Sequence, residues 1–197
     1  MLIVFEGLDG SGKSTAAEFV AKELDYKLVS APSNTSNAGK LARELLSSNY
    51  KDYSKESVSL IISLLSVIDR SHLPTHNTVY SRYALSSLAY VKIPDSTIEE
   101  YFKRILDESV EPDLVFFINT PPDICYNRIQ NRARALELYE TLDHLNYVYK
   151  RYTEKAIPYF ISLGWNIVTI DGTLSVDKVR ETCLEHIERC IYPRRYP

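Results

Sequence analysis

The chain lacks the features that mark specialised classes of small protein. Its 197 residues include only three cysteines, six glycines, one methionine and one tryptophan. With 45% hydrophobic and 25% charged residues, it has the composition of a globular protein, which excludes the disordered and fibrous classes. A chain of this length buries roughly 70% of its unfolded surface, so it needs no disulfide or metal to hold a core. One domain is expected.

Neither sign of charge dominates the sequence. There are 23 lysine and arginine residues and 26 acidic residues, which gives a net charge of −3 and a pI near 5.8. This balance gives no reason to expect a nucleic-acid partner. Any anion site must therefore be a local arrangement of residues.

Cysteine usage and hydropathy favour the cytoplasm. Cys125, Cys183 and Cys190 form no CxxC pair, and their odd number and spacing match neither a zinc site nor a secreted disulfide scaffold. The apolar run at the N-terminus meets Glu6 too early for a signal-peptide core, and nowhere do about 18 apolar residues follow one another. We expect a cytoplasmic protein that neither crosses nor binds a membrane.

Short apolar runs alternate with segments of helical spacing. Five of these runs predict buried strands, at 2–5, 27–29, 78–80, 114–118 and 166–170. The intervening patterns predict helices at about 13–24, 38–48, 55–71, 84–92, 96–109, 121–133, 136–162 and 175–190. This alternation indicates an α/β fold, and Pro158 should kink or interrupt the long helix.

The predicted helix 55–71 is apolar around most of its circumference. Such a pattern predicts a central, buried helix. Its polar end, Asp69 and Arg70, is then conspicuous.

A phosphate-binding motif follows the first strand. Gly7-Leu8-Asp9-Gly10-Ser11-Gly12-Lys13-Ser14 fits GxxxxGK[ST] at every fixed position, and helix-forming sequence continues from Thr15. Glycines allow successive amide groups to point at phosphate oxygens, and the start of a helix favours negative charge at the same place. The motif predicts an ATP site formed by residues 7–15, with Lys13 on the β and γ phosphates and the Ser14 hydroxyl on Mg²⁺.

This loop alone does not define the reaction, because NTPases, GTPase switches and small-molecule kinases share it. The chain is too short for the added domains of motor ATPases. No guanine-reading NKxD motif follows the fourth strand, where the sequence is Phe117-Ile118-Asn119-Thr120. A GTPase is therefore disfavoured.

Four segments together carry a family resemblance that covers nearly the whole chain. They are the segment from Phe5 to Thr15, Leu64-Leu65 with Asp69-Arg70, Val79-Tyr80-Ser81-Arg82-Tyr83 followed by Ser86-Ser87-Leu88-Ala89-Tyr90, and Glu111-Pro112-Asp113-Leu114 with Arg128 and Arg132. In this order they resemble the thymidylate kinases, which transfer the γ-phosphoryl group of ATP to dTMP. The resemblance implies a five-stranded parallel sheet of the P-loop nucleoside monophosphate kinase type and a single kinase domain with a lid at about 128–140.

The resemblance also assigns roles in the acceptor site. Arg82 would contact the acceptor phosphate, in keeping with its place after a buried strand, where ligands collect in α/β sheets. Arg70 would read the acceptor base or phosphate, and Asp9 would accept a hydrogen bond from the sugar 3′-hydroxyl. Tyr90 and Tyr139 would pack on the deoxyribose. Ser86 belongs to the same acceptor-binding segment.

Catalytic cations are expected in the lid. Arg128 and Arg132 lie four residues apart on a predicted helix, hence on one face, and Arg134 follows them. Family members without an arginine in the phosphate loop carry basic residues in the lid, and the corresponding loop position here is Gly10. The resemblance thus implies that Lys13, Arg82, Arg128 and Arg132 stabilise charge on the transferred group.

Three positions depart from the family pattern. Ser81 replaces the acidic residue after the third strand, which predicts weaker metal organisation or slower turnover. Ser66 stands where an aromatic residue stacks on thymine, and Asn34 stands where the loop after the second strand carries a basic residue. Because stacking is worth roughly 1 to 3 kcal/mol per base, its loss predicts a relaxed acceptor preference, for instance dUMP alongside dTMP.

Two other functions stay open at this point. A deoxynucleoside kinase would need a carboxylate base, and Glu6 is the obvious candidate. A nucleotide-binding regulatory module would fit the losses at Ser81 and Ser66, although Lys13, Ser14 and the lid arginines favour an enzyme. The resemblance further implies a homodimer that uses ATP, Mg²⁺ and a deoxynucleoside monophosphate.

Overall fold

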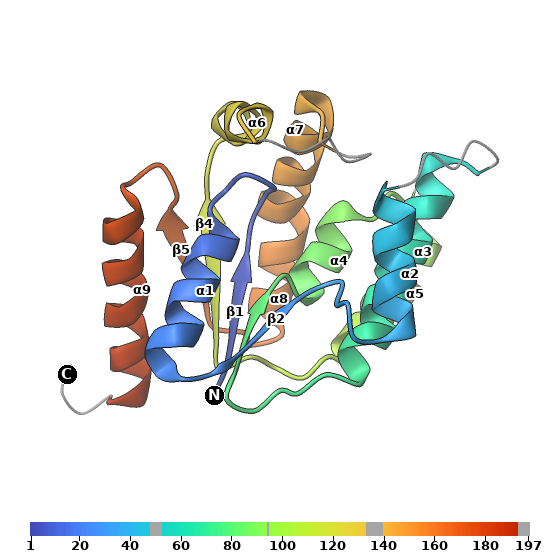
Figure 1. The fold of residues 1–197 in the computed structure, drawn as a ribbon. Helices are drawn as coiled ribbons and strands as arrows, with labels where there is room; N and C mark the ends of the chain where they lie inside the picture. The colour runs from blue at the N-terminus through green and yellow to red at the C-terminus, as the bar shows by residue number, and fades with distance from the viewer. Residues whose placement is uncertain (48–52, 94, 133–139, 193–197) are drawn as a thin grey trace.

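The computed structural model describes residues 1–47, 53–93, 95–132 and 140–192 (Figure 1). Five strands form one sheet, and all of its neighbouring strands are parallel, in the order β2-β3-β1-β4-β5. They are β1 (Leu2–Glu6), β2 (Lys27–Ser30), β3 (Thr78–Ser81), β4 (Leu114–Asn119) and β5 (Ile167–Asp171). The predicted α/β class and all five predicted strands are confirmed.

Alternate side chains of the strands enter two separate cores. Leu2 and Val4 of β1 lie in one core, while Ile3 and Phe5 lie in the other. This division follows from the strand geometry, in which successive side chains point to opposite faces. Because helices cover both faces of the sheet, the strands are apolar on successive residues.

Helices of the first half of the chain lie close to their predicted bounds. They are α1 (Lys13–Leu24), α2 (Asn37–Ser47), α3 (Lys55–Ser71), α4 (Ala84–Tyr90) and α5 (Ser96–Asp107). Those of the second half are α6 (Pro122–Gln130), α7 (Leu142–Arg151), α8 (Ile157–Ser162) and α9 (Val176–Ile191). α1 and α9 cover one face of the sheet, and α4 and α7 cover the other (Figure 1).

The predicted helix 136–162 is not one regular α-helix. Its described part begins at Leu142, and a π-helical turn, η1 (Tyr152–Ala156), separates α7 from α8. Pro158 has no N–H group to donate to a carbonyl one turn earlier, so the chain widens immediately before it. The expected interruption at Pro158 is confirmed.

The expectation that α3 is a central, buried helix is wrong. Ile61 and Ile68 are 42% and 51% exposed, whereas Ser59, Ser63 and Ser66 are buried. α3 therefore turns its serine face toward the rest of the molecule and leaves apolar side chains at the surface. The pattern misled because serine side chains of α3 share the buried side of the helix and line a pocket, where Ile62 joins them.

The carboxyl ends of the parallel strands lie at one edge of the sheet. The segments after β1, β3, β4 and β5 therefore lie near one another, and this edge is where α/β proteins bind ligands. In the part of the chain that the structure describes, no helix combines the length and apolarity needed to span a membrane.

Candidate active site

The phosphate loop, residues 7–14, connects β1 to α1 at this edge. Gly10 and Gly12 have φ values of +82° and +98°, in the left-handed region that favours glycine. A Cβ atom on Gly10 would lie 2.4 Å from the backbone oxygen of Cys125 in α6. No residue with a side chain, arginine included, can stand at this loop position without moving α6.

Lys13 is 5% exposed, and its ammonium group turns back over the loop. Its Nζ donates to the Leu8 carbonyl at 3.0 Å and to Asp9 Oδ1 at 3.5 Å. Burial and the nearby charge of Arg82 lower its pKa from 10.5 to about 8, although Asp9 partly opposes this shift. The ammonium is therefore poorly compensated until an anion such as a phosphate arrives.

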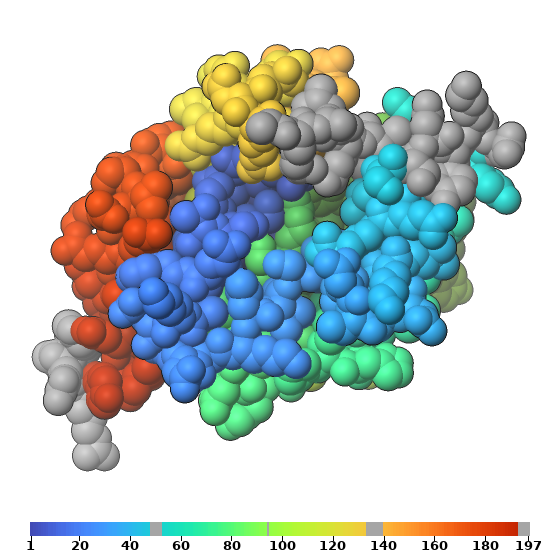
Figure 2. Space-filling view, viewed as in Figure 1, coloured from blue at the N-terminus to red at the C-terminus, as the bar shows by residue number. Residues whose placement is uncertain are grey.

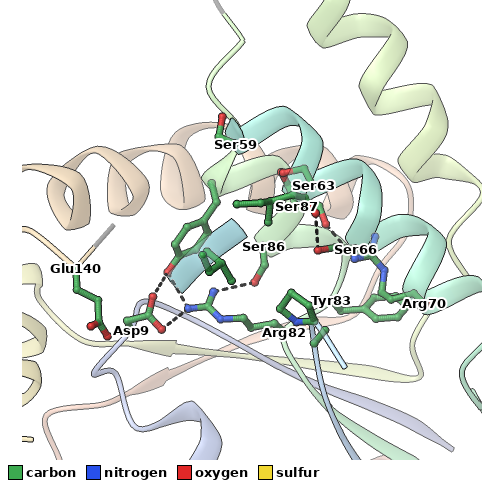
Figure 3. A pocket seen from close by; sticks show the side chains of 15 residues that line it. Asp9, Ser59, Ser63, Ser66, Arg70, Arg82, Tyr83, Ser86, Ser87 and Glu140 are labelled. Carbon is green, nitrogen blue, oxygen red and sulfur yellow. Dashed lines mark hydrogen bonds and ion pairs between the residues drawn. The ribbon is translucent and has the colours of Figure 1, made fainter. Parts of the chain in front are cut away.

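Asp9, Arg82 and Tyr90 form a compact cluster beside the loop (Figure 3). Arg82 Nη2 lies 2.5 Å from Asp9 Oδ1 and 2.9 Å from the Tyr90 hydroxyl, which itself donates to Asp9 Oδ2 at 3.1 Å. Burial alone would raise the pKa of Asp9, but the charges of Arg82 and Lys13 hold it well below its usual range. Burial alone would lower the pKa of Arg82, but the charge of Asp9 raises it. The pKa of Arg82 is therefore well above its ordinary value. Asp9 is thus an anion and Arg82 a cation at any physiological pH.

The backbone of Arg82 has φ +76°, a conformation that non-glycine residues rarely adopt. Two contacts hold it there, because its N–H donates to the Phe5 carbonyl at 2.9 Å and the next amide, Tyr83 N, donates to Glu6 Oε1 at 2.7 Å. Strain of this kind concentrates at functional sites. The turn aims the guanidinium group at Asp9.

Ser14 lies at the start of α1, and its hydroxyl is 3.2 Å from that of Ser81 at the end of β3. The position that departs from the family pattern thus faces the predicted magnesium ligand directly. Hydroxyl oxygens are suitable ligands for Mg²⁺, or for its bound waters, when nucleotide phosphates supply the remaining charge. The residues present therefore fit Mg²⁺.

A serine pocket opens on one side of Asp9. It is lined by Asp9, Ala31, Pro32, Leu46, Ser59, Ile62, Ser63, Ser66, Arg70, Arg82, Tyr83, Ser86, Ser87, Tyr90 and Glu140. Figure 3 shows Arg82 and Asp9 at one end of this pocket and Arg70 at the other. In the space-filling view, green atoms of the middle of the chain are visible between the blue N-terminal segment and cyan α2 (Figure 2).

Arg70 is buried at the far end of the serine pocket. Its Nη1 donates to Ser87 Oγ at 2.9 Å, and its guanidinium carbon lies 5.1 Å from the centre of the Tyr83 ring. Among the described residues, its Nε and Nη2 have no hydrogen-bond partner. Buried donors without partners are costly, so Arg70 is an exception to the usual pairing of buried polar groups.

Asp69 binds the loop after β2 and forms no hydrogen bond to its neighbour Arg70 among the described residues. Its carboxylate accepts hydrogen bonds from Ser33 N at 2.6 Å, Ser33 Oγ at 2.7 Å and Ser36 Oγ at 2.6 Å. It thereby fixes the loop after β2 against α3. Asn34, in this loop, is exposed.

A second pocket, here called the arginine pocket, opens on the other side of the phosphate loop. It is lined by Gly10, Ser11, Gly12, Thr15, Ala16, Ile118, Arg128, Arg132, Gly172, Leu174, Val176, Val179 and Arg180. Arg128 donates to the carbonyls of Gly10 at 3.4 Å, Ser11 at 3.3 Å and Gly172 at 3.0 Å. It therefore fastens α6 to the phosphate loop and to the turn after β5.

Sequence reasoning expected Arg128 and Arg132 on one helix, but only Arg128 lies in α6. α6 ends at Gln130, and Arg132 follows in a turn, 3.9 Å from the buried carboxylate of Glu140. Both arginines nevertheless line the arginine pocket. Arg134 and Tyr139 lie outside the described residues, as does most of the predicted lid.

Sequence reasoning missed a group of buried hydrogen bonds around Glu6. It is fully buried, and its carboxylate binds Ser86 and Tyr152 as well as the turn after β3. Ser86 was predicted to bind the acceptor, and it does line the serine pocket. The sequence held one signal for these contacts, because Glu6 directly follows four apolar residues of a buried strand.

Comparisons with known proteins agree with one another. The model of the family described as thymidylate kinase matches residues 5–183. A probable thymidylate kinase of Methanocaldococcus jannaschii is 31% identical over 197 residues, covering 95% of this chain and 96% of that protein. A thymidylate kinase of Leptospira interrogans is 29% identical over 94% of this chain and 92% of its own length.

A solved structure is similar in fold. The thymidylate kinase of Candida albicans, described as having broad substrate specificity, superposes with a TM-score of 0.73 and 24% identity, covering 95% of this chain and 90% of that one. The family match and the relatives show where the chain belongs. With a phosphate loop between two pockets and this match over most of its length, the chain belongs to the thymidylate kinase family.

Proposed function

We propose that ATP binds over the phosphate loop with its base in the arginine pocket, and that dTMP binds in the serine pocket with its phosphate at Arg82. As a member of the thymidylate kinase family, the protein is a phosphotransferase that moves the γ-phosphoryl group of ATP to dTMP. One observation carries the assignment of sites. The two pockets open on either side of one phosphate loop. Asp9 of this loop lines the serine pocket, and Gly10 lines the arginine pocket.

The chemistry follows from the placement of charge. Phosphoryl transfer needs little covalent assistance, so positioning and cationic stabilisation supply the catalysis. Lys13 would bind the β and γ phosphates, and Arg82 would hold the acceptor phosphate while Asp9 accepts the sugar 3′-hydroxyl. Arg128 and Arg132 border the donor site and would stabilise the charge of the transferred group. Mg²⁺, bound through Ser14, would neutralise part of the phosphate charge.

A deoxynucleoside kinase is disfavoured by Glu6. Its carboxylate is fully buried and accepts hydrogen bonds from two backbone amides and two hydroxyls, so it is not poised to take a proton from a 5′-hydroxyl. Arg82 instead offers a cation that suits an acceptor already bearing a phosphate. A purely regulatory module would have no use for cations that act on the transferred group, the role proposed for Arg128 and Arg132.

The far end of the serine pocket supports recognition of a keto group. Arg70 Nε and Nη2 are donors without partners, and the hydroxyl protons of Ser63 and Ser66 are already given to backbone carbonyls. A thymine or uracil carbonyl would satisfy Arg70, whereas the amino group of cytosine would set donor against donor.

Loss of an aromatic residue at Ser66 supports a relaxed preference among keto bases. Ser66 lines the pocket one turn before Arg70 and offers no ring for a base to stack on. We therefore expect dUMP to be accepted with dTMP, and the broad specificity of the Candida albicans relative is consistent with this. Tyr90, beside Asp9, would favour a deoxyribose by filling the space of a 2′-hydroxyl.

We also propose a homodimer located in the cytoplasm. Ile61 and Ile68 lie seven residues apart on one face of α3, and Leu41 of the neighbouring α2 is 44% exposed. A second copy of the chain would cover these side chains. Three free thiols, at Cys125, Cys183 and Cys190, suit a reducing compartment.

An acceptor panel tests the proposal. Purified protein with ATP and Mg²⁺ should form ADP fastest with dTMP, more slowly with dUMP, and at the level of the Lys13→Ala blank with dCMP and thymidine. Turnover of thymidine but not dTMP would establish the nucleoside kinase instead. ATP binding without turnover of any acceptor would leave the regulatory module.

A further inference from the structure

We propose that Glu6 and Tyr152 are positioning residues that hold Arg82 in place for the acceptor phosphate. The proposal rests on the role of Arg82 proposed above, and it concerns two side chains that lie outside both pockets. Both are fully buried. A chain of hydrogen bonds through Ser86 connects both residues to Arg82.

The Glu6 carboxylate holds the turn that carries Arg82. Oε1 accepts the backbone amides of Tyr83, the residue before α4, at 2.7 Å and of Ser86, its third residue, at 3.0 Å. α4 has no other side-chain cap at this end. Since Arg82 has a positive φ, the amide bond to Tyr83 N directly after it prevents the turn from relaxing.

The second carboxylate oxygen, Oε2, accepts the hydroxyl protons of Ser86 and Tyr152, the latter at 2.9 Å. The two hydroxyls also lie 2.8 Å from each other, and either can be the donor of that contact. Ser86 Oγ accepts a hydrogen bond from Arg82 Nη1 at 3.3 Å, because a guanidinium group has only donors. The chain runs from the guanidinium group through Ser86 to Glu6, and Tyr152 supports its buried end.

Tyr152 enters this chain because of the π-helical turn. It begins η1, and its ring packs against Phe117 with centroids 5.2 Å apart. The preceding residue, Arg151, donates to the Leu88 carbonyl at the other end of α4, at 2.8 Å from Nη2. Residues 151 and 152 thus bind both ends of α4, which presents Ser86 and Tyr90 to the pocket. π-helical turns are frequent at functional sites.

This arrangement fixes the orientation of the guanidinium N–H groups of Arg82. Arg82 must keep Nη2 on Asp9 and Tyr90 while it leaves an approach for a phosphate (Figure 3). Bidentate recognition of phosphate by arginine depends on such orientation. Loss of the buried hydrogen bonds should therefore weaken the acceptor selectively and leave the donor nucleotide little affected.

Steady-state kinetics of conservative variants test the proposal. Tyr152→Phe removes only the hydroxyl, and Glu6→Gln keeps the shape but turns one acceptor into a donor. We expect the KM for dTMP to rise roughly three- to tenfold in Tyr152→Phe and about tenfold or more in Glu6→Gln. The KM for ATP should change less than about twofold in both variants. Tyr159→Phe is the matched control, because its hydroxyl binds Asp107 and neither residue lines a pocket, so its kinetics should equal those of the parent protein.

A double-mutant cycle separates positioning from general support of the fold. In an Arg82→Lys background, which lacks the guanidinium fork, Tyr152→Phe and Glu6→Gln should each raise the KM for dTMP by less than about twofold. Full additivity, or equal rises in both KM values, would overturn the proposal even if the parent protein phosphorylates dTMP. If the parent protein does not phosphorylate dTMP, the proposed function fails instead. Tyr152→Phe keeps the test decisive should Glu6→Gln not fold.

Discussion

The buried lysine of the phosphate loop should make ATP capture sensitive to mildly alkaline pH. Burial and the charge of Arg82 lower the pKa of Lys13 to about 8 in the nucleotide-free protein. The charged form is therefore lost as pH rises through about 8, and at pH 9 only roughly a tenth of the molecules retain it. The other charged groups of the cluster do not titrate in this range, because the pKa of Asp9 is lowered and that of Arg82 is raised.

The kinetic consequence differs between kcat/KM and kcat. Since kcat/KM reports the free enzyme, its value for ATP should be nearly constant below about pH 7 and fall about fivefold from pH 8 to pH 9. Bound phosphates raise the pKa of Lys13, so kcat should fall only at higher pH. ATP binding at pH 8.5 should take up about 0.7 proton per site, which titration calorimetry in two buffers measures.

A matched variant isolates the lysine. Lys13→Arg keeps a positive charge throughout, so its kcat/KM for ATP, although lower, should not change between pH 7 and 9.5. A parent profile that stays flat to pH 9.5, or ATP binding without proton uptake at pH 8.5, would refute the reasoning. A decline shared by Lys13→Arg would assign the titration to another group.

Three substitutions test other parts of the account. Ser81→Asp places a carboxylate beside Ser14 and should lower the Mg²⁺ concentration for half-maximal rate by about tenfold; an unchanged Mg²⁺ titration would contradict the proposed metal position. Ser66→Phe should lower the KM for dTMP by about tenfold through stacking, and an unchanged KM at unchanged Tm would count against base binding beside α3. Gly39→Ala should destabilise the protein by roughly 1 to 3 kcal/mol in denaturant titrations, because its Cβ would lie 2.4 Å from the Ser33 carbonyl; an unchanged midpoint would show that the loop after β2 yields easily.

The sheet could be predicted from sequence because its strands are apolar on successive residues and are separated by helical segments. The phosphate loop could be placed for the same reason, since its motif lies between a strand and a helix. α3 could not be oriented in this way. Its apolar residues suggested burial, but Ile61 and Ile68 are exposed, because the serine face surrounds a pocket that hydrophobic periodicity does not describe.

The detailed contacts of the site depended on tertiary structure. Sequence marked Asp69 and Arg70 as a conspicuous polar pair, yet Asp69 binds the loop after β2, 36 residues away along the chain. The Glu6 contacts join segments separated by 146 residues, and a π-helical turn places Tyr152 among them. Such long-range polar contacts leave no periodic signal in the sequence.

The most direct test of the central claim is a crystal structure with dTMP and a non-hydrolysable ATP analogue. The account predicts the dTMP phosphate within hydrogen-bond distance of Arg82, the thymine carbonyl on Arg70 and the analogue's base in the arginine pocket. A structure with dTMP bound elsewhere, or with the Arg70 Nε and Nη2 groups still without partners, would contradict it.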